Sequence, residues 1–190
     1  MRVPVAAEGW PFILPLAMAA CIMGWMGWWA AAAVFGVAAL ACLGFFRDPD
    51  AGIAEMTRVT KPGGTVAACM WDIADGGMTM LRMFWAAVRT VRPHARGESA
   101  MPGTSGGDLV DRFHRAGMTS VWGEPIVVSA MYDDFDDFWE PFTYGIGPSG
   151  GFLVTLTEPE QAEVRAACRS ELPDGPFSLS ARAWYAQGIA

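Results

Sequence analysis

The sequence predicts an α/β fold preceded by a hydrophobic helical membrane segment, and two observations support this. The chain holds 13 basic and 20 acidic residues, yet none of them lies between Glu8 and Arg47. From Gly52 onward, apolar residues at helical spacing alternate with short apolar runs that are typical of strands. We therefore expect a membrane anchor in residues 1–50 and an α/β domain in residues 51–190.

The apolar run of residues 11–46 is long enough to enter a membrane. As one straight helix it would be about 54 Å long, which exceeds the ~30 Å hydrocarbon core of a bilayer. We expect a break at Pro15 or in the tryptophan-rich stretch Gly24–Trp29, which suits the headgroup level. Basic residues on both flanks then predict a cell-membrane protein whose C-terminal part is cytoplasmic. A cleaved signal peptide and a buried hairpin of a soluble protein are the alternatives.

The first elements of the α/β domain are a helix and a strand. Apolar residues at helical spacing predict a helix over residues 52–60, which the turn Lys61–Gly64 ends because Pro cannot continue it. The continuous apolar run Thr65–Trp71 predicts a strand that is buried on both faces. Asp72 follows at the carboxyl end of this strand, where open α/β sheets bind their ligands.

The rest of the chain predicts further helices and two more strands. Helices are expected over residues 78–93, 107–118 and 158–172, and strands over residues 126–132 and 177–188. The glycine-rich stretches 102–107 and 149–151 are expected to be loops.

Several polar patterns have a structural explanation. The acidic run Asp133–Asp137 is expected to start a helix in solvent, because such a segment binds divalent ions only weakly. His114 is expected at the surface of its helix, and the cysteines, which form no CxxC pair, are expected to act as small buried hydrophobes. No metal site is predicted. An acidic balance without basic clusters argues against nucleic acid as a partner.

The stretch "EMTRVTKPGGTVAACMWD", residues 55–72, carries a resemblance to a known family. From about Gly52 to its end, the chain resembles the C-terminal half of class I S-adenosylmethionine-dependent methyltransferases of the ubiquinone/menaquinone-biosynthesis type. The resemblance implies a partial Rossmann-like sheet whose fifth, sixth and seventh strands start at Thr65, Ile126 and Phe177, the last lying antiparallel between the other two. It implies S-adenosylmethionine as the cofactor, but the family's glycine-rich loop has no counterpart, so no cofactor-binding residue is assigned.

A second resemblance concerns the N-terminal part. The stretch "VAAEGWPFI", the apolar run and "FFRDPD" resemble the N-terminal membrane segment of phosphatidylserine decarboxylase proenzymes, over about residues 3–50. The Gly-Ser-Thr self-cleavage motif of that family does not follow, so the resemblance implies a membrane anchor and no catalytic serine. The two patterns meet within a few residues of Asp48–Ala51.

Three functions follow from these patterns. The first is a membrane-tethered methyltransferase-like protein that lacks its own cofactor-binding half and is inactive alone. The others are a decarboxylase-related membrane protein of phospholipid biosynthesis without its catalytic domain, and a non-catalytic fusion product. The sequence leaves open whether the chain is an enzyme, and it does not predict the small-molecule substrate.

Residues that could line a substrate pocket follow the predicted strands or lie on the next helix. Such groups can form an apolar pocket that positions a nucleophile, although filling the core is the competing explanation. The candidates are Trp71, Asp72, Phe84, Trp85, Tyr132, Trp139 and Tyr144. The strand Thr65–Trp71 is further expected to be unpaired on one side, covered by the N-terminal helices, or paired with another chain.

Overall fold

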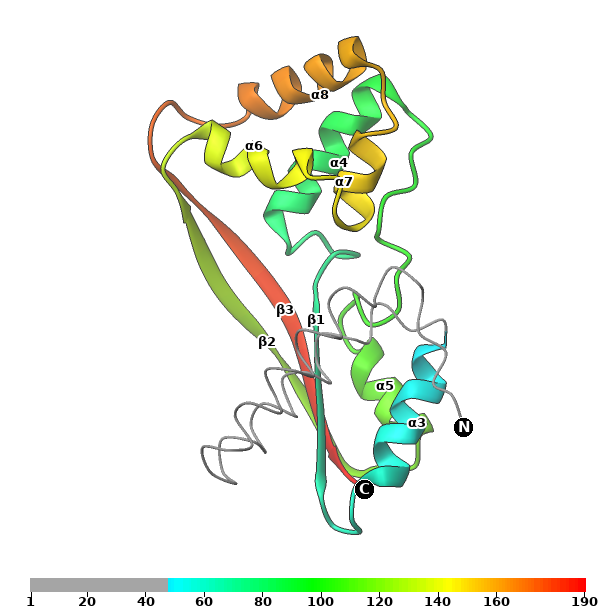
Figure 1. Cartoon of the computed structure of the whole chain (residues 1–190). Coiled ribbons are helices and arrows are strands. Elements are labelled where there is room, and N and C mark those ends of the chain that lie inside the picture. Colours follow the sequence, from blue (N-terminus) through cyan, green and yellow to red (C-terminus); the bar gives the residue numbers. More distant parts are fainter. Residues whose placement is uncertain (1–47) are drawn as a thin grey trace, which may run out of the picture. The chain divides into compact units, whose positions relative to one another are not determined.

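The computed structural model describes residues 48–190 (Figure 1). The predicted membrane segment, residues 11–46, lies outside the described residues, so the predictions of a membrane partner and a membrane location stay predictions. Within the described range, no helix combines the length and the apolar character that crossing a membrane requires.

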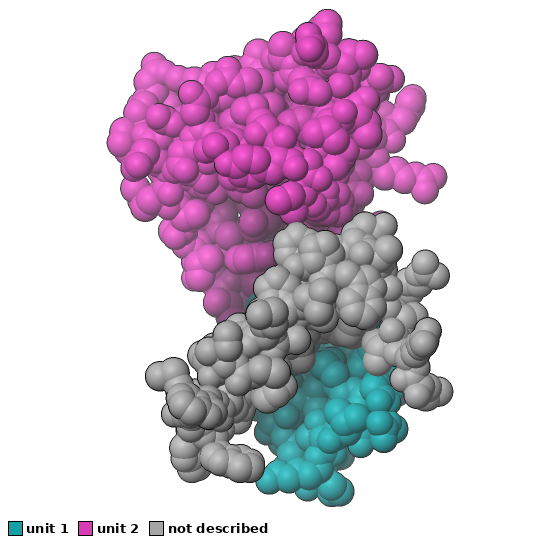
Figure 2. Space-filling model, in the orientation of Figure 1, with its two compact units in different colours: residues 1–70, 105–125, 184–190 teal, residues 71–104, 126–183 magenta. Residues whose placement is uncertain are grey.

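The described residues form an α/β fold, as the sequence predicts. Two compact units are formed, one from residues 48–70, 105–125 and 184–190 and the other from residues 71–104 and 126–183 (Figure 2). The elements in chain order are α3 (Pro49–Val59), β1 (Thr65–Trp71), α4 (Thr79–Val91), α5 (Asp108–Arg115), β2 (Thr119–Tyr132), α6 (Phe135–Thr143), α7 (Gly147–Leu153), α8 (Glu158–Ser170) and β3 (Phe177–Ile189).

The three strands form one sheet in the order β1-β3-β2. The Ala190 N–H donates to the Gly64 carbonyl at 2.9 Å, and the Asp72 N–H donates to the Arg182 carbonyl at 2.9 Å. Residue numbers thus rise along β1 as they fall along β3, so these strands are antiparallel. Ring contacts of Trp122 with Tyr185 and of Tyr132 with Phe177 give the same direction for β2 against β3. The last strand therefore lies antiparallel between the other two, as expected.

The prediction that β1 is buried on both faces is wrong. Val66 and Ala68 are buried, but Thr65 is exposed and the Trp71 side chain keeps 43% of its surface. Alternation of this kind means that one face of the strand packs on a core while the other is less covered. Within residues 48–190 the sheet has three strands, so β1 forms one edge and β2 the other.

Two segments differ from the sequence prediction. Strand β2 begins at Thr119, seven residues before the expected start, and includes Pro125; an edge strand tolerates proline because one row of its N–H groups needs no partner. The stretch expected as a glycine-rich loop, residues 149–151, lies in helix α7. Gly150 has no room for a side chain, since a Cβ atom would lie 3.0 Å from the Phe142 carbonyl oxygen. Close packing on α6 thus overrides the low helix propensity of glycine.

The unit that contains α3 and α5 has a small core of its own. Ile53 of α3 and Phe113 of α5 are fully buried, and Val66 and Ala68 of β1 belong to the same cluster. Asp48 caps α3 by accepting a hydrogen bond from the Ala51 N–H at 3.0 Å, which satisfies a backbone donor that the helix leaves free. His114 is exposed beside buried Phe113, as predicted.

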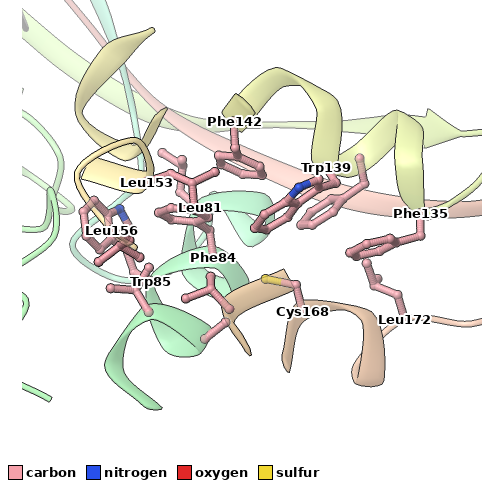
Figure 3. Close-up of a cluster of buried hydrophobic side chains, with 14 of the residues drawn as sticks. Leu81, Phe84, Trp85, Phe135, Trp139, Phe142, Leu153, Leu156, Cys168 and Leu172 are labelled. Atoms are coloured by element: carbon pink, nitrogen blue, oxygen red, sulfur yellow. The ribbon is translucent and has the colours of Figure 1, made fainter. Parts of the chain in front are cut away.

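The other unit has an aromatic core (Figure 3). Phe84 of α4 stacks on Phe142 of α6 with ring centroids 4.4 Å apart, and Phe138 packs edge-on against Phe142. Cys168 of α8 lies in the same cluster, where burial raises the pKa of its thiol to about 12. The thiol is therefore protonated and unreactive at neutral pH, in agreement with the prediction of a buried hydrophobe.

The acidic run before α6 starts a helix, as expected. The Asp134 carboxylate accepts a hydrogen bond from the Asp137 N–H at 3.0 Å, and the Asp137 carboxylate accepts one from the Asp133 N–H at 3.1 Å. Asp136 pairs with Arg165 of α8. Each of these carboxylates thus has a structural partner at the N-terminus of α6.

The aromatic core predicts the cost of removing its central ring. Phe138→Ala should lower the free energy of unfolding by about 3–5 kcal/mol, because the fully buried ring contacts four other aromatic rings. Urea denaturation followed by circular dichroism measures this. Ile146→Ala, at an exposed position, is the matched control and should change it by less than about 0.5 kcal/mol. Similar losses for both variants would contradict this description of the core.

Candidate functional site

The loop that follows β1 is fixed by the buried carboxylate of Asp72. Arg182 of β3 donates from Nε to Asp72 Oδ2 at 2.5 Å, and the Asp75 N–H donates to Oδ1 at 3.0 Å. The Asp72 backbone forms two further hydrogen bonds: its N–H donates to the Arg182 carbonyl, and its carbonyl accepts from the Met78 N–H. The loop of residues 72–78 is therefore held on β3 by one side chain and by its own backbone.

Gly77 is required where this loop returns to the sheet. A Cβ atom at Gly77 would lie 2.2 Å from Asp72 Oδ2 and 2.8 Å from Arg182 Cβ. Without a side chain, its carbonyl oxygen comes close enough to accept a hydrogen bond from the Arg182 N–H at 3.0 Å. Glycine at this position thus leaves room for the Asp72–Arg182 ion pair and lets β3 approach the loop closely.

A pocket of about 360 Å³ lies beside this loop. The loop contributes one wall through residues 73–76, and α4 contributes another through Leu81, Arg82, Trp85 and Arg89. Glu98 and Ser99, from the segment after α4, also line it. The volume falls within the range of small-molecule sites, and the pocket follows the carboxyl end of a strand, where open α/β sheets bind ligands.

Trp85 and Glu98 form a fixed pair in the wall of the pocket. The Trp85 Nε1–H donates to Glu98 Oε1 at 3.2 Å, and Ser149 of α7 bonds the same carboxyl group through its backbone and its side chain. Burial raises the pKa of Glu98, and this effect exceeds the lowering by these hydrogen bonds. Gly97 lies flat against the indole, since a Cβ atom there would come within 3.2 Å of the ring. Trp85 therefore has little freedom to turn.

The structure brings one of the predicted aromatic candidates to the pocket and distributes the others elsewhere. Trp85 lines it, and Asp72 shapes the loop without reaching it, because its side chain is fully buried. Phe84 and Trp139 fill the core. Trp71 and Tyr144 are exposed, and the Tyr144 hydroxyl donates to Glu140. Tyr132 is half-buried, with its hydroxyl 3.4 Å from the Met80 sulfur.

Sequence reasoning missed Arg82, Arg89 and Glu98. The two arginines lie seven residues apart, so they share one face of α4, and this spacing could have been read from the sequence. Glu98 carried no such signal. Its burial depends on contacts with Trp85 and with Ser149, which is 51 positions further along the chain.

Comparisons with known proteins find similarity among solved structures alone. No family model matches the sequence, and neither does any curated protein. A solved structure from Bacillus halodurans C-125, titled a "putative methyltransferase", is 15% identical, with a TM-score of 0.42 over 79% of this chain and 61% of that one. The chain thus spans less than two thirds of that protein. The resemblance to phosphatidylserine decarboxylase, which rests almost wholly outside the described residues, stays a prediction.

The Asp72–Arg182 ion pair predicts a graded response to substitution. Asp72→Ala should lower the free energy of unfolding by about 2–3 kcal/mol, because it removes the acceptor of two hydrogen bonds and leaves a buried space. Asp72→Asn should cost less, since the amide keeps the shape and one oxygen. Urea denaturation of the two variants tests this. Equal stability of Asp72→Ala and the unchanged protein would show that the loop does not depend on this carboxylate.

The raised pKa of Glu98 predicts how stability depends on pH. The folded state holds the proton of Glu98 more tightly than the unfolded state, so the stability from this group is full at low pH and is lost as pH rises through the raised pKa. Glu98→Gln cannot titrate. Relative to the unchanged protein, this variant should gain stability between about pH 4 and about pH 7.5.

Thermal unfolding at these two pH values measures the difference. Glu163→Gln, at an exposed position on α8, is the control. A gain for Glu98→Gln that is the same at both pH values would contradict the predicted sign.

Proposed function

We propose that the described residues form a methyltransferase-like domain whose pocket beside the loop after β1 binds the methyl acceptor. The observation that carries this proposal is the sheet, in which the last strand lies antiparallel between two strands that are parallel to each other. This is the arrangement that the resemblance to class I methyltransferases implies. The pocket at the carboxyl end of β1 adds support, because open α/β sheets bind ligands there.

The described residues do not fit a site for S-adenosylmethionine. A ribose needs a free carboxylate at a strand end, but Asp72 has both oxygens engaged and no exposed surface. After β2, Asp134 and Asp137 are occupied in starting α6. We therefore propose that the donor side of the reaction lies outside the described residues.

What the pocket can supply is a fixed and partly apolar surface for the acceptor. Ile73, Leu81 and the indole of Trp85 offer apolar contact, and Trp85 is held from two sides by Glu98 and Gly97. Methyl transfer between two bound molecules depends mainly on holding them in line and on keeping water out. A rigid wall of this kind therefore contributes to methyl transfer by holding the acceptor in position.

The experiment that tests the proposal compares small-molecule pools in cells with and without the gene. Loss of the gene should remove at least one methylated small molecule and raise the precursor that differs from it by one methyl group. The unchanged chain and Tyr144→Phe should restore the product. Trp85→Ala should not, because it removes the apolar wall. A pool of methylated small molecules that does not change on loss of the gene would contradict the proposal.

Calorimetry of the purified full chain with S-adenosylmethionine examines the donor side separately. We expect no micromolar binding by this chain alone, because the carboxylates at the described strand ends are engaged. Micromolar binding would contradict this expectation and show that the chain itself holds a donor site.

A further inference from the structure

One face of α4 presents an indole between two guanidinium groups to the pocket. Arg82 precedes Trp85 by three residues and Arg89 follows it by four, so the three side chains lie on one face of the helix, one turn apart. The Cα atoms of the two arginines are separated by about 10 Å along the axis. Arginine side chains are long enough to bring both guanidinium groups toward one ligand over the indole.

Both of these arginines lack an acidic partner within the described part of the chain. Ion pairs engage seven of the ten arginines of residues 48–190. One of them is Arg92, which caps the C-terminus of α4 and pairs with Glu160 at 2.7 Å. The three that form none are Arg82, Arg89 and Arg96. Two of these three line the same pocket. In a chain with net charge −7, two neighbouring arginines without a carboxylate partner indicate a place for an external anion.

The acidic groups of the pocket do not cancel this charge. Glu98 already accepts hydrogen bonds from Trp85 and Ser149, so its oxygens are engaged in the wall, and its burial disfavours the ionised form. Asp75 is the other carboxylate that lines the pocket, and it lies on the loop, across from α4. An anion in the pocket therefore meets two arginine side chains that can form strong charged hydrogen bonds, whereas a cation would be repelled by them.

We infer that the pocket binds a small apolar molecule that carries a carboxylate or phosphate group, with its charged group held by Arg82 and Arg89. Its apolar part lies on Trp85, Ile73 and Leu81. Guanidinium groups suit both kinds of anion because their N–H donors match two oxygens at once. The inference rests on the proposed function in one respect, namely that this anion is the methyl acceptor.

The test compares a charged probe with a neutral molecule of the same shape. Phenylacetate and phenylacetamide are titrated into the purified full chain at low ionic strength, and binding is followed by calorimetry. Phenylacetate should bind at least about tenfold more tightly, because hydrogen bonds to charged groups contribute more than neutral ones. Phenyl phosphate, titrated in parallel, shows which of the two anions the arginines prefer. Equal affinity for the charged and neutral probes would overturn the inference.

Variants assign the effect to these two side chains. In the double variant Arg82→Gln with Arg89→Gln, phenylacetate and phenylacetamide should bind about equally. Added salt should no longer weaken the binding of phenylacetate. Arg96→Gln removes the same charge from a nearby exposed position outside the pocket, and it should keep the preference. All three positions are exposed, so circular dichroism should show unchanged folding. A preference that survives the double variant would also overturn the inference.

The two proposals fail in different ways, because this titration needs no methyl donor. Anion preference without any change in methylated small molecules would overturn the proposed function and leave the anion site. Restored methylation by the unchanged chain, together with equal binding of the two probes, would overturn the anion site alone.

Discussion

The ion pair between the buried carboxylate of Asp72 and the partly exposed side chain of Arg182 is the constraint on which the site depends. It joins the end of β1 to β3, and it does so at the residue where the chain leaves the sheet. A charged group with no exposed surface is costly unless its oxygens are satisfied, and here an arginine and a backbone N–H satisfy them. The loop that forms one wall of the pocket is consequently anchored at both ends, and Gly77 leaves the space that this arrangement needs.

Helix α4 contributes side chains both to the aromatic core and to the pocket. Phe84 and Val88 are fully buried in the aromatic cluster with α6 and α8, whereas Arg82 and Arg89 face the pocket. Trp85 belongs to both, since its ring packs edge-on against Phe84 with ring centroids 5.3 Å apart and it also lines the pocket. The packing of the core therefore also sets the position of the side chains that line the pocket. A substitution in the core is expected to shift these side chains.

Much of the fold could be predicted from the sequence, and the site could be predicted only in part. Apolar spacing was enough for α4, α5 and α8, and the resemblance gave the position of β3 between β1 and β2. The first half of β2 was missed because Gly123 and Pro125 interrupt its pattern; Gly123 fits since a Cβ atom would lie 2.5 Å from the Tyr185 carbonyl oxygen. Glu98 was missed because its burial arises from partners distant in sequence, which no local pattern encodes.

Helix α7 has a consequence for how the protein moves. Three of its seven residues are glycines, and each lowers the intrinsic tendency to form a helix by about 1 kcal/mol relative to alanine. The helix thus persists through its packing on α6 and α4 and is the element we expect to open first in local unfolding. Ser149 of α7 bonds Glu98, so each such opening frees the carboxyl group that holds Trp85. Amide exchange at α7 and the freedom of the Trp85 indole to turn are thereby coupled, and a ligand bound on Trp85 would slow that exchange.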